Sequence, residues 1–345
     1  MLKQRNGKAK RKRPFRFAVV GCGRMGFVRA RAAAILGGKL AAACDVDVRR
    51  ARELVALHGS GMALAEPNDL EWRRIDAVFV CTPPFVRGEV ELAAIRAGVA
   101  IFLEKPVGVT AAGVGPVLEA LKVSGVVNAV GYMNRYRNSV GEARRLARER
   151  GVLALSCNWV AGRYGVWWRE QEELSGGGLN DEATHLVDLA RYLVGEIVEV
   201  EAVRDLENGG PSMVGTVAGV LRFELGQLGT LLYNGQASGK QIGLRLHTPA
   251  GELRLDSWDF DLIHDDKKVL GRPLGSDRSD IFRIEVKAFM DAVGGSGRST
   301  IRSTFADAVK TQQVVDALRR SGTDGHSQSL RNDLAHSAGR SLLQR

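Results

Sequence analysis

The chain has 345 residues, 45% of them hydrophobic, which is enough apolar material for two domains of ordinary size. Its apolar runs all fall short of the ~20 residues that a membrane-spanning helix needs, so we expect no membrane partner. The four cysteines stand singly, without the paired spacing of zinc or redox motifs; they are Cys22, Cys44, Cys81 and Cys157. These features favour a globular cytoplasmic protein without a metal site.

The net charge of +10 is concentrated at the start of the chain, because eight of the ten excess positive charges lie within residues 1–16. Phe15 is the only aromatic residue there, and one ring offers no stacking platform for nucleic-acid bases. Glycines and arginines interrupt the apolar stretch that follows, which excludes a secretion signal. We therefore interpret residues 1–14 as a flexible basic arm and expect no nucleic-acid partner.

A glycine motif follows the first apolar run, which ends at residue 20. Gly21, Gly23 and Gly26 form G-x-G-x-x-G directly before a helical stretch, an arrangement typical of dinucleotide binding. The first glycine permits a tight turn, the second lets the backbone approach a pyrophosphate, and the third lets the helix pack on the strand. We expect Arg24 and Met25, within the same turn, to contact the cofactor as well.

Asp45 ends the second apolar run, nineteen residues after the last glycine of the motif. A carboxylate at this position can accept hydrogen bonds from ribose hydroxyls, and it would repel a 2′-phosphate. NAD is therefore the expected cofactor. Arg49 and Arg50 leave NADP open, because a nearby guanidinium can offset that repulsion.

Strands and helices alternate up to about residue 135, a pattern typical of a doubly wound parallel sheet, the Rossmann type of α/β fold. The later apolar runs predict strands at residues 77–81, 100–103 and 126–130, and helices at residues 48–58, 86–97 and 111–123. Ligands bind such sheets at the carboxyl ends of the strands. We therefore predict an NAD(P)-binding domain over residues 15–135.

Three loops at these strand ends carry further candidates. A core strand that runs directly into Glu104, Lys105 and Pro106 indicates a site rather than a simple turn, and it places Lys105 beside the nicotinamide. Tyr132 follows another strand and is a candidate substrate contact. The predicted cofactor contacts from these loops are Thr82, Pro83, Pro84, Arg87, Glu104, Lys105 and Asn134.

After residue 136 the pattern changes to a run of strands, which predicts an α+β domain over residues 136–322 with a mostly antiparallel sheet. The expected strands lie at residues 152–160, 198–203, 214–223, 229–233, 242–248 and 252–255. Helices at residues 281–293 and 303–320 are expected to close this domain. Residues 323–345 read as a polar tail.

Within this second domain, three glycines at residues 176–178 open a predicted helix that runs to residue 193. At about 100° per residue, Asp181, His185, Asp188 and Tyr192 share one face of it. Asp181 and His185 are expected to hydrogen-bond, so that the carboxylate fixes the imidazole tautomer and stabilises its protonated form for proton transfer. The alternative is an amphipathic helix with a solvated face. Asn180, at the start of this helix, is a candidate substrate contact.

The loop before this helix is rich in aromatic and guanidinium groups. Tryptophan faces stack on sugar rings, and arginine holds carboxylates or phosphates. Arg163 and Trp168 are therefore candidate substrate contacts, with a structural loop or a subunit contact as the alternative. The other five histidines show no ligand spacing, which supports the expectation of no metal.

Taken together, the motifs resemble the glucose–fructose oxidoreductase, inositol dehydrogenase and rhizopine-catabolism (GFO/IDH/MocA) family over roughly residues 15–320. The resemblance implies that Lys105 polarises the reacting oxygen and that Asp181 with His185 handles its proton. It also implies a C-terminal sheet that joins subunits into a homodimer or homotetramer. One departure is Arg87, because members often carry histidine about three residues beyond the Thr-Pro-Pro loop.

The expected function is NAD(P)-dependent oxidoreduction between a secondary alcohol and a ketone on a sugar, polyol or sugar derivative. Two alternatives stay open. One is an enzyme of the same family that uses NAD transiently for glycoside cleavage or epimerisation. The other is a dinucleotide-sensing regulator without catalysis, against which the joint presence of Lys105, Asp181 and His185 counts.

Overall fold

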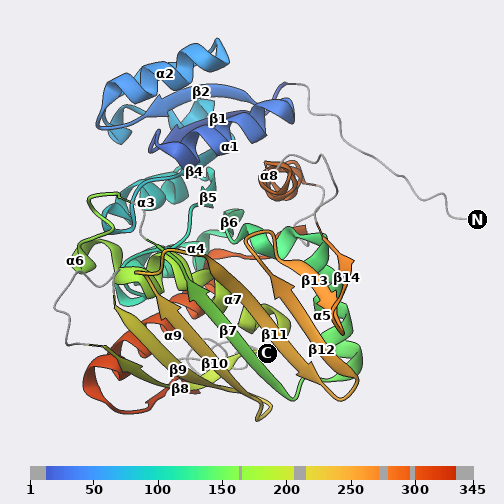
Figure 1. Cartoon of the computed structure of the whole chain (residues 1–345). Helices are drawn as coiled ribbons and strands as arrows, with labels where there is room; N and C mark the ends of the chain where they lie inside the picture. Colours follow the sequence, from blue (N-terminus) through green and yellow to red (C-terminus); the bar gives the residue numbers. More distant parts are fainter. Residues whose placement is uncertain (1–12, 163–164, 206–214, 272–278, 296–299, 332–345) are drawn as a thin grey trace, which may run out of the picture.

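The computed structural model describes residues 13–162, 165–205, 215–271, 279–295 and 300–331. These residues form two sheets with their covering helices, one above the other in Figure 1. Within these ranges, no helix combines the length and the hydrophobicity that crossing a membrane requires.

The first sheet has six strands in the order β3-β2-β1-β4-β5-β6, all parallel. This confirms the predicted doubly wound sheet, because β1 lies in the middle and the order reverses beside it. The strand β3 was not predicted. The strands are β1 (Arg16–Val20), β2 (Lys39–Cys44), β3 (Met62–Leu64), β4 (Ala77–Val80), β5 (Ala100–Leu103) and β6 (Asn128–Val130).

Helices cover both faces of this sheet, as the near-continuous apolar strands require. Five 3₁₀ turns lie between them at Pro67–Asp69, Trp72–Arg74, Pro84–Val86, Ala112–Val114 and Met133–Tyr136. The α-helices of this part of the chain are α1 (Arg24–Ile35), α2 (Val48–His58), α3 (Glu89–Arg96) and α4 (Gly115–Ser124).

The position of helix α8 (Asp280–Val293) in the chain predicted that it would close the second domain, and this prediction is wrong. The helix packs on the first domain, beside α1 (Figure 1). Its Phe289 ring lies 5.8 Å from that of Phe79 and 5.5 Å from that of Phe102, both in the first sheet. The apolar face of α8 therefore completes the core of the nucleotide-binding domain, and the chain crosses between the two domains more than once.

The second sheet has nine strands in the order β14-β13-β12-β11-β7-β10-β9-β8-β15. Only the β7 and β10 pair is parallel, so the predicted mostly antiparallel sheet is confirmed. The strands are β7 (Ala154–Val160), β8 (Ile197–Arg204), β9 (Thr216–Phe223), β10 (Leu228–Asn234), β11 (Gln241–Thr248), β12 (Gly251–Asp256), β13 (Asp261–His264), β14 (Lys267–Leu270) and β15 (Gln328–Ser329).

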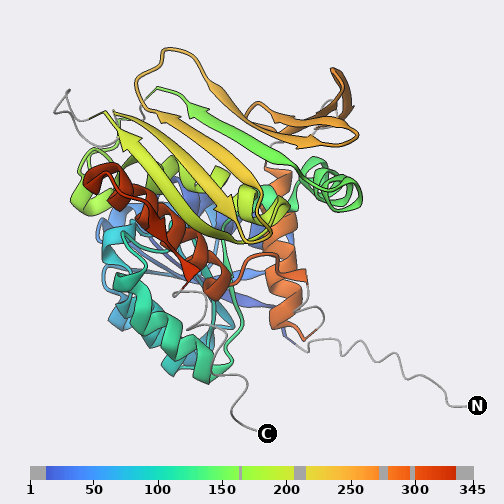
Figure 2. The same cartoon turned by 90° about the horizontal axis from the view of Figure 1, so that it is seen from below.

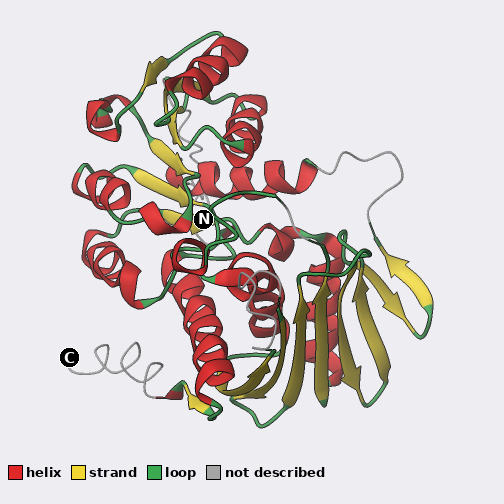
Figure 3. Cartoon of the chain, turned by 60° about the vertical axis from the view of Figure 1, so that its left-hand side comes forward, coloured by secondary structure: helices red, strands yellow, loops and turns green. Residues whose placement is uncertain are grey.

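Helices cover one face of this sheet, and the other face is open (Figures 2 and 3). The burial of β9 and β10 alternates residue by residue, which matches one packed and one solvent-facing side. The helices of this region are α5 (Asn138–Arg150), α6 (Glu172–Ser175), a π-helical segment (Leu179–Ala183), α7 (Thr184–Leu193) and α9 (Phe305–Asp324).

The predicted polar tail is partly folded. Residues 328 and 329 add β15 to the edge of the second sheet, and Leu330 is buried in its core. Residues 1–12 of the predicted arm and residues 332–345 lie outside the described residues, whereas Arg13 pairs with Asp76 at 2.8 Å.

Candidate active site

The glycine turn after β1 has the geometry of a dinucleotide cradle. Gly21 has a φ of 87°, and a Cβ there would lie 2.7 Å from the backbone of Cys81 and Thr82. A Cβ at Gly26 would overlap the carbonyl oxygen of Gly21. At Gly23, by contrast, nothing lies within 4 Å, and α1 begins there without a side-chain cap. The first N–H groups of a helix have no acceptor within the helix itself, so an open turn of this kind can receive a pyrophosphate.

Asp45 lies at the end of β2, beside this turn. Its carboxylate accepts hydrogen bonds from the backbone N–H of Cys22 at 2.7 Å and of Asp47 at 2.9 Å. A carboxylate can accept about four hydrogen bonds, so it retains capacity for ribose hydroxyls. Arg49 and Arg50 both pair with Asp47 instead, at 2.9 Å and 3.7 Å.

The loop after β4 offers an unmatched polar atom. Thr82 Oγ1 is buried and has no hydrogen-bond partner within the described part of the chain. Pro83 and Pro84 follow it into a short 3₁₀ turn. A buried hydroxyl without a partner is costly, so Thr82 fits the predicted contact with a bound cofactor.

Lys105 lies just beyond β5 and reaches across to the second domain. Its Nζ donates a hydrogen bond to the backbone carbonyl oxygen of Asp181 at 2.7 Å and lies 3.6 Å from Asp181 Oδ1. The Lys105 side chain is 16% exposed, whereas that of Asp181 is 3% exposed. An ammonium has three donors, so Lys105 keeps N–H groups for a further oxygen.

The predicted hydrogen bond between Asp181 and His185 is wrong. The segment Leu179–Ala183 is π-helical and α7 begins only at Thr184, so the spacing of four residues does not place the two side chains as in an α-helix. The Asp181 carboxylate instead faces Lys105 and Arg169, with the Arg169 Nε at 3.2 Å. His185 Nδ1 is buried without a hydrogen-bond partner among the described residues.

His185 is enclosed by aromatic rings. The Trp159 ring stacks on it with centroids 5.9 Å apart and planes at 17°, and Tyr132 meets it edge-on at 6.2 Å. Burial, followed by the charges of Lys105 and Arg137, holds the pKa of His185 well below its usual value. The imidazole is therefore neutral at neutral pH, which corrects the expected stabilisation of its protonated form.

Neither face of α7 is solvated. Asp188 accepts two hydrogen bonds from Arg135, at 2.9 Å from Nε and 2.7 Å from Nη2. Tyr192 lies against the guanidinium groups of Arg135 and Arg144, whose carbons are 4.9 Å and 3.9 Å from the ring centroid. The helix is inserted between the sheet and α9, so the alternative of an amphipathic helix with a solvated face is wrong.

Two of the candidate substrate contacts, Tyr132 and Asn180, are buried and bonded within the protein. Tyr132 is buried, and its hydroxyl lies 2.8 Å from Thr184 Oγ1. Asn180 is fully buried; its amide nitrogen donates to the carbonyl oxygens of Gly108 and Ser175, and its oxygen accepts from Gln312. Both side chains are thus used within the protein, which leaves no basis for a direct substrate contact from either one.

The aromatic loop does lie near Asp181. The Trp168 ring is 6.5 Å from that of Phe85, and the guanidinium carbon of Arg169 is 5.4 Å from the Trp168 ring centroid. Trp167 is largely exposed and also meets Phe85, at 6.2 Å. Arg163 lies outside the described residues.

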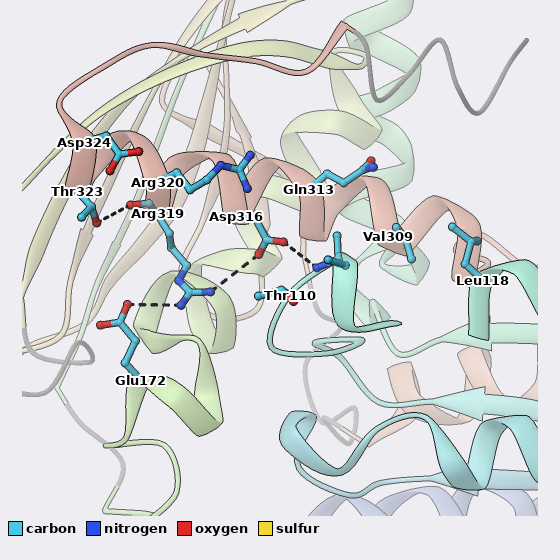
Figure 4. A pocket seen from close by; sticks show the side chains of 12 residues that line it. Thr110, Leu118, Glu172, Val309, Gln313, Asp316, Arg319, Arg320, Thr323 and Asp324 are labelled. Carbon is cyan, nitrogen blue, oxygen red and sulfur yellow. Dashed lines mark hydrogen bonds and ion pairs between the residues drawn. The ribbon is translucent and has the colours of Figure 1, made fainter. Parts of the chain in front are cut away.

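A cavity of about 670 Å³ lies elsewhere, between α4, α6 and α9 (Figure 4). Three of its charged side chains pair with one another, since Arg319 contacts Glu172 at 3.5 Å and Asp316 at 3.9 Å. Lys105 and His185 are not among its lining residues, so this cavity is not the candidate active site. Among the described residues, no group of three or more histidine, cysteine or acidic side chains forms a metal site.

Comparisons with known proteins agree with this geometry. Residues 15–132 match the model of an oxidoreductase family with an NAD-binding Rossmann fold, and residues 150–254 match the GFO/IDH/MocA C-terminal domain. Myo-inositol 2-dehydrogenase from Thermotoga maritima is 31% identical over 63% of this chain and 67% of its own length. The chain belongs to the GFO/IDH/MocA oxidoreductase family.

Two further matches concern levoglucosan dehydrogenase. The protein from Pseudarthrobacter phenanthrenivorans is 28% identical over 54% of this chain, and the chain spans 58% of its length. A solved levoglucosan dehydrogenase in complex with NADH and levoglucosan has a TM-score of 0.79, with 22% identity over 91% of this chain and 98% of that one. At this identity the structural match shows the shared GFO/IDH/MocA fold.

For a GFO/IDH/MocA protein, the loop after β4 departs from the usual pattern at Arg87, and the structure shows what this arginine does. It donates to the carbonyl oxygens of Val80 and Glu104, both at 3.0 Å, and so ties together the ends of β4 and β5. Glu104 in turn accepts from the buried Arg29 at 2.5 Å. The side chains of Arg87 and Glu104 therefore bind other parts of the protein, and the predicted cofactor contacts of these two side chains are without support. The predicted cofactor contact of Asn134 is also without support, because its Oδ1 accepts a hydrogen bond from Arg137.

Sequence reasoning missed three residues around the GFO/IDH/MocA site. Arg169 was part of the predicted aromatic loop, but its pairing with Asp181 was not expected. Trp159 and Glu182 were not singled out. Trp159 lies at an inward-facing position of the predicted strand β7, and Glu182 is an acid among the apolar residues of a buried helix. The sequence pattern could therefore have pointed to both residues.

Proposed function

We propose that this protein is an NAD-dependent oxidoreductase that interconverts a secondary alcohol and a ketone on a sugar or polyol. The observation that carries the proposal is the placement of Lys105 beyond the carboxyl end of β5, where its Nζ donates to the carbonyl oxygen of Asp181, four residues before the buried His185. One group can stabilise an oxyanion and the other can accept a proton. The aligned regions span only 38–67% of the first three relatives, so the proposal rests on this site rather than on their names.

The chemistry follows from these two side chains. Bound NAD supplies the nicotinamide that accepts a hydride from the alcohol carbon. His185, neutral at neutral pH, accepts the hydroxyl proton. Lys105 stabilises the developing alkoxide with a charge-assisted hydrogen bond, and Asp181 holds the ammonium in place through its carbonyl oxygen.

Cofactor binding is proposed to use the glycine turn and Asp45. The N–H groups at the start of α1 face the pyrophosphate, and Asp45 accepts from the ribose hydroxyls. Arg49 and Arg50 are engaged by Asp47 rather than turned toward the ribose, which supports NAD over NADP. Arg24 and Met25 remain proposed contacts, since they form the first turn of α1.

The substrate is proposed to be an uncharged molecule with several hydroxyl groups. Trp168 and Phe85 present aromatic surface near Asp181, and aromatic faces stack on the C–H faces of sugar rings. The matched relatives include enzymes named for levoglucosan and inositol, which are polyhydroxylated rings.

Subunits are proposed to associate through the open face of the nine-stranded sheet, as a homodimer or homotetramer in the cytoplasm. This face exposes a group of apolar side chains on β8, β9 and β10, namely Val203, Val220 and Leu232. An exposed apolar group on a broad sheet favours a protein partner. Val220→Glu is expected to lower the mass in solution, measured by light scattering; an unchanged mass would reject this face.

The function is tested with a panel of polyols, sugars, sugar acids and amino sugars, assayed with NAD and NADP in both directions. The expected result is net formation of reduced nicotinamide with at least one polyol or sugar, and a preference for NAD. Product formation without net change in the cofactor would instead support the transient use of NAD. Cofactor binding without any reaction across the panel would favour a regulator.

A further inference from the structure

His185 lacks the polar partner that usually fixes an imidazole. Its Nδ1 is buried and unpaired within the described ranges, and Asp181 is committed to Lys105 and Arg169. Ring orientation nevertheless matters, because a base must present one nitrogen to one proton. The position of the ring is therefore set by what packs on it, which is Trp159 face to face and Tyr132 edge-on.

Trp159 is itself held by a buried carboxylate. Its Nε1 donates to Glu182 Oε2 at 3.1 Å, and the Tyr233 hydroxyl donates to the same oxygen at 3.4 Å. Trp159 on β7 and Tyr233 on β10 are directly paired across the parallel ladder, so both reach Glu182 from the sheet. All three side chains are buried.

The backbone around Glu182 is built for this close approach. Glu182 lies in the π-helical segment, three residues before His185 and next to Asp181. A Cβ at Gly178 would collide with the Tyr233 ring and hydroxyl, so the glycine lets the helix start lie directly on β10. Glu182 thus connects the sheet to the segment that carries His185.

We propose that Glu182 and Trp159 are positioning residues for His185: the carboxylate fixes the indole, and the indole fixes the position and plane of the imidazole. This inference rests on the proposed function, in which His185 accepts the substrate proton. It adds a second layer of side chains behind the groups that touch the substrate.

An acidic side chain such as Glu182 is energetically costly in this buried position. A buried indole N–H needs an acceptor, and a carboxylate is a stronger one than an amide or hydroxyl. Burial, followed by the charge of Asp181, raises the pKa of Glu182 to about 7, although Lys105, Arg169 and the Tyr233 hydroxyl oppose the shift. The chain therefore keeps a costly group where leucine would pack at no electrostatic penalty, which supports a role beyond filling space.

The test compares Glu182→Leu, which removes the acceptor, with Glu182→Gln, which keeps one, and with Trp159→Phe, which keeps an aromatic ring but no N–H. Tyr233→Phe is the matched control, because it removes a hydroxyl from the same carboxylate and leaves the bond from Trp159 intact. The first readout is the pKa and tautomer of His185, from nitrogen chemical shifts of histidine-labelled protein, assigned with His185→Asn. The second is kcat against KM with the substrate found by the panel.

In the parent protein the pKa of His185 is expected to lie well below its usual value. Glu182→Leu and Trp159→Phe should shift the nitrogen signals of His185 and lower kcat by about 10- to 100-fold with little change in KM for NAD, because the base is misplaced while the cofactor site is intact. Glu182→Gln and Tyr233→Phe should stay close to the parent in both readouts.

The nuclear magnetic resonance result does not depend on turnover, so it separates the two claims. An inactive parent protein with shifted His185 signals in the variants would remove the proposed function and keep the positioning role. Unchanged nitrogen signals and pKa of His185 in a folded Glu182→Leu or Trp159→Phe protein would overturn the positioning role. Trp159→Phe decides the matter if Glu182→Leu fails to fold.

Discussion

Two pairs of a cation and an aspartate join the first domain to the segment that contains α7, and they differ in burial. Lys105 meets Asp181 at the start of the segment with 16% of the lysine side chain exposed, whereas Arg135 meets Asp188 two turns later with 4% of the arginine exposed. The lysine makes one short hydrogen bond to a carbonyl oxygen; the arginine makes two to its carboxylate.

This difference indicates that the two pairs on the segment containing α7 have different roles. The Arg135 guanidinium contacts Asp188, Asp307 and the carbonyl oxygen of Arg302, so most of its donors are already used within the protein. Lys105 makes one short hydrogen bond to the carbonyl oxygen of Asp181 and a longer contact of 3.6 Å with its carboxylate, and an ammonium with three donors can still serve a further oxygen. We therefore expect the buried pair to hold the domains together, and we propose that the open pair takes part in the chemistry.

Loss of the open pair should abolish most catalysis. Lys105→Ala is expected to lower kcat by roughly 10²–10⁴-fold, because the lost hydrogen bond strengthens as charge develops on the substrate oxygen. Binding of NAD and the midpoint of thermal unfolding should change little. The check is kcat beside a separate titration of the cofactor; Lys105→Arg should rescue little, since a planar fork does not replace a compact ammonium.

Loss of the buried pair should instead reduce stability. Arg135→Ala leaves Asp188 buried without its partner, which typically costs about 3–5 kcal/mol in the free energy of unfolding. Urea unfolding measures the change. The control is Arg145→Ala, which removes an exposed arginine paired with Glu142 and Glu149 and should have little effect. Equal losses in the two variants would contradict the assignment of Arg135 as the domain anchor.

The cofactor preference depends on Asp45. Asp45→Ala should weaken NAD binding by about 10- to 100-fold, since a hydrogen bond to a charged group contributes about 1.5–3 kcal/mol. NADP should lose less, because the repulsion of its phosphate disappears too. Fluorescence titrations of the reduced cofactors give both values; a parent protein that binds NAD and NADP equally would contradict the assignment.

Asp181→Asn should be milder than Lys105→Ala, with kcat lowered by about 10-fold. The main anchor of Lys105 is the backbone carbonyl oxygen of Asp181, and this oxygen survives the substitution. The amide still accepts a hydrogen bond but no longer offsets the charges of Lys105 and Arg169. A loss as large as that of Lys105→Ala would show that the carboxylate itself takes part in proton transfer.

The smallest expected effect is the contribution of Glu182 to the pH dependence of the free energy of unfolding. Its folded pKa of about 7 lies above the usual glutamate pKa of 4.5, so between these values the folded protein binds more protons than the unfolded chain. Stability contributed by this group is therefore present at low pH and falls as pH rises through that window. Glu182→Gln should remove this fall, so its stability relative to the parent should be greater at pH 8 than at pH 5 in urea unfolding.

Local patterns predicted most of the first domain, because its strands are short apolar runs that end in turn residues. They missed β3, which has only three residues, and the hairpin of β13 and β14, whose turn is made by Asp265 and Asp266 with φ of 46° and 61°. Two acidic residues with positive φ fit a tight hairpin turn, but the flanking strands are too polar to show a clear alternation.

Two other differences could not have been found from local pattern. The apolar face of α8 shows that the helix is packed, but Phe289 does not reveal that its partners are Phe79 and Phe102 rather than the second sheet. The π-helical turn changes the angle around the helix axis between the side chains of Asp181 and His185. The predicted positions of these side chains used 100° per residue, which holds only for an α-helix. The sequence patterns named candidate site residues, and the partner of each one depended on the fold.

The most direct test of the proposed chemistry is a transfer of label during a single turnover. The substrate found by the panel is deuterated at the reacting carbon and mixed with NAD and excess parent protein or Lys105→Ala protein. The account predicts that deuterium appears on the nicotinamide of the accumulated reduced cofactor with the parent protein, and that the rate falls at least about 100-fold with Lys105→Ala while NAD remains bound. Product formed at the parent rate by the Lys105→Ala protein, or without deuterium on the nicotinamide, would contradict it.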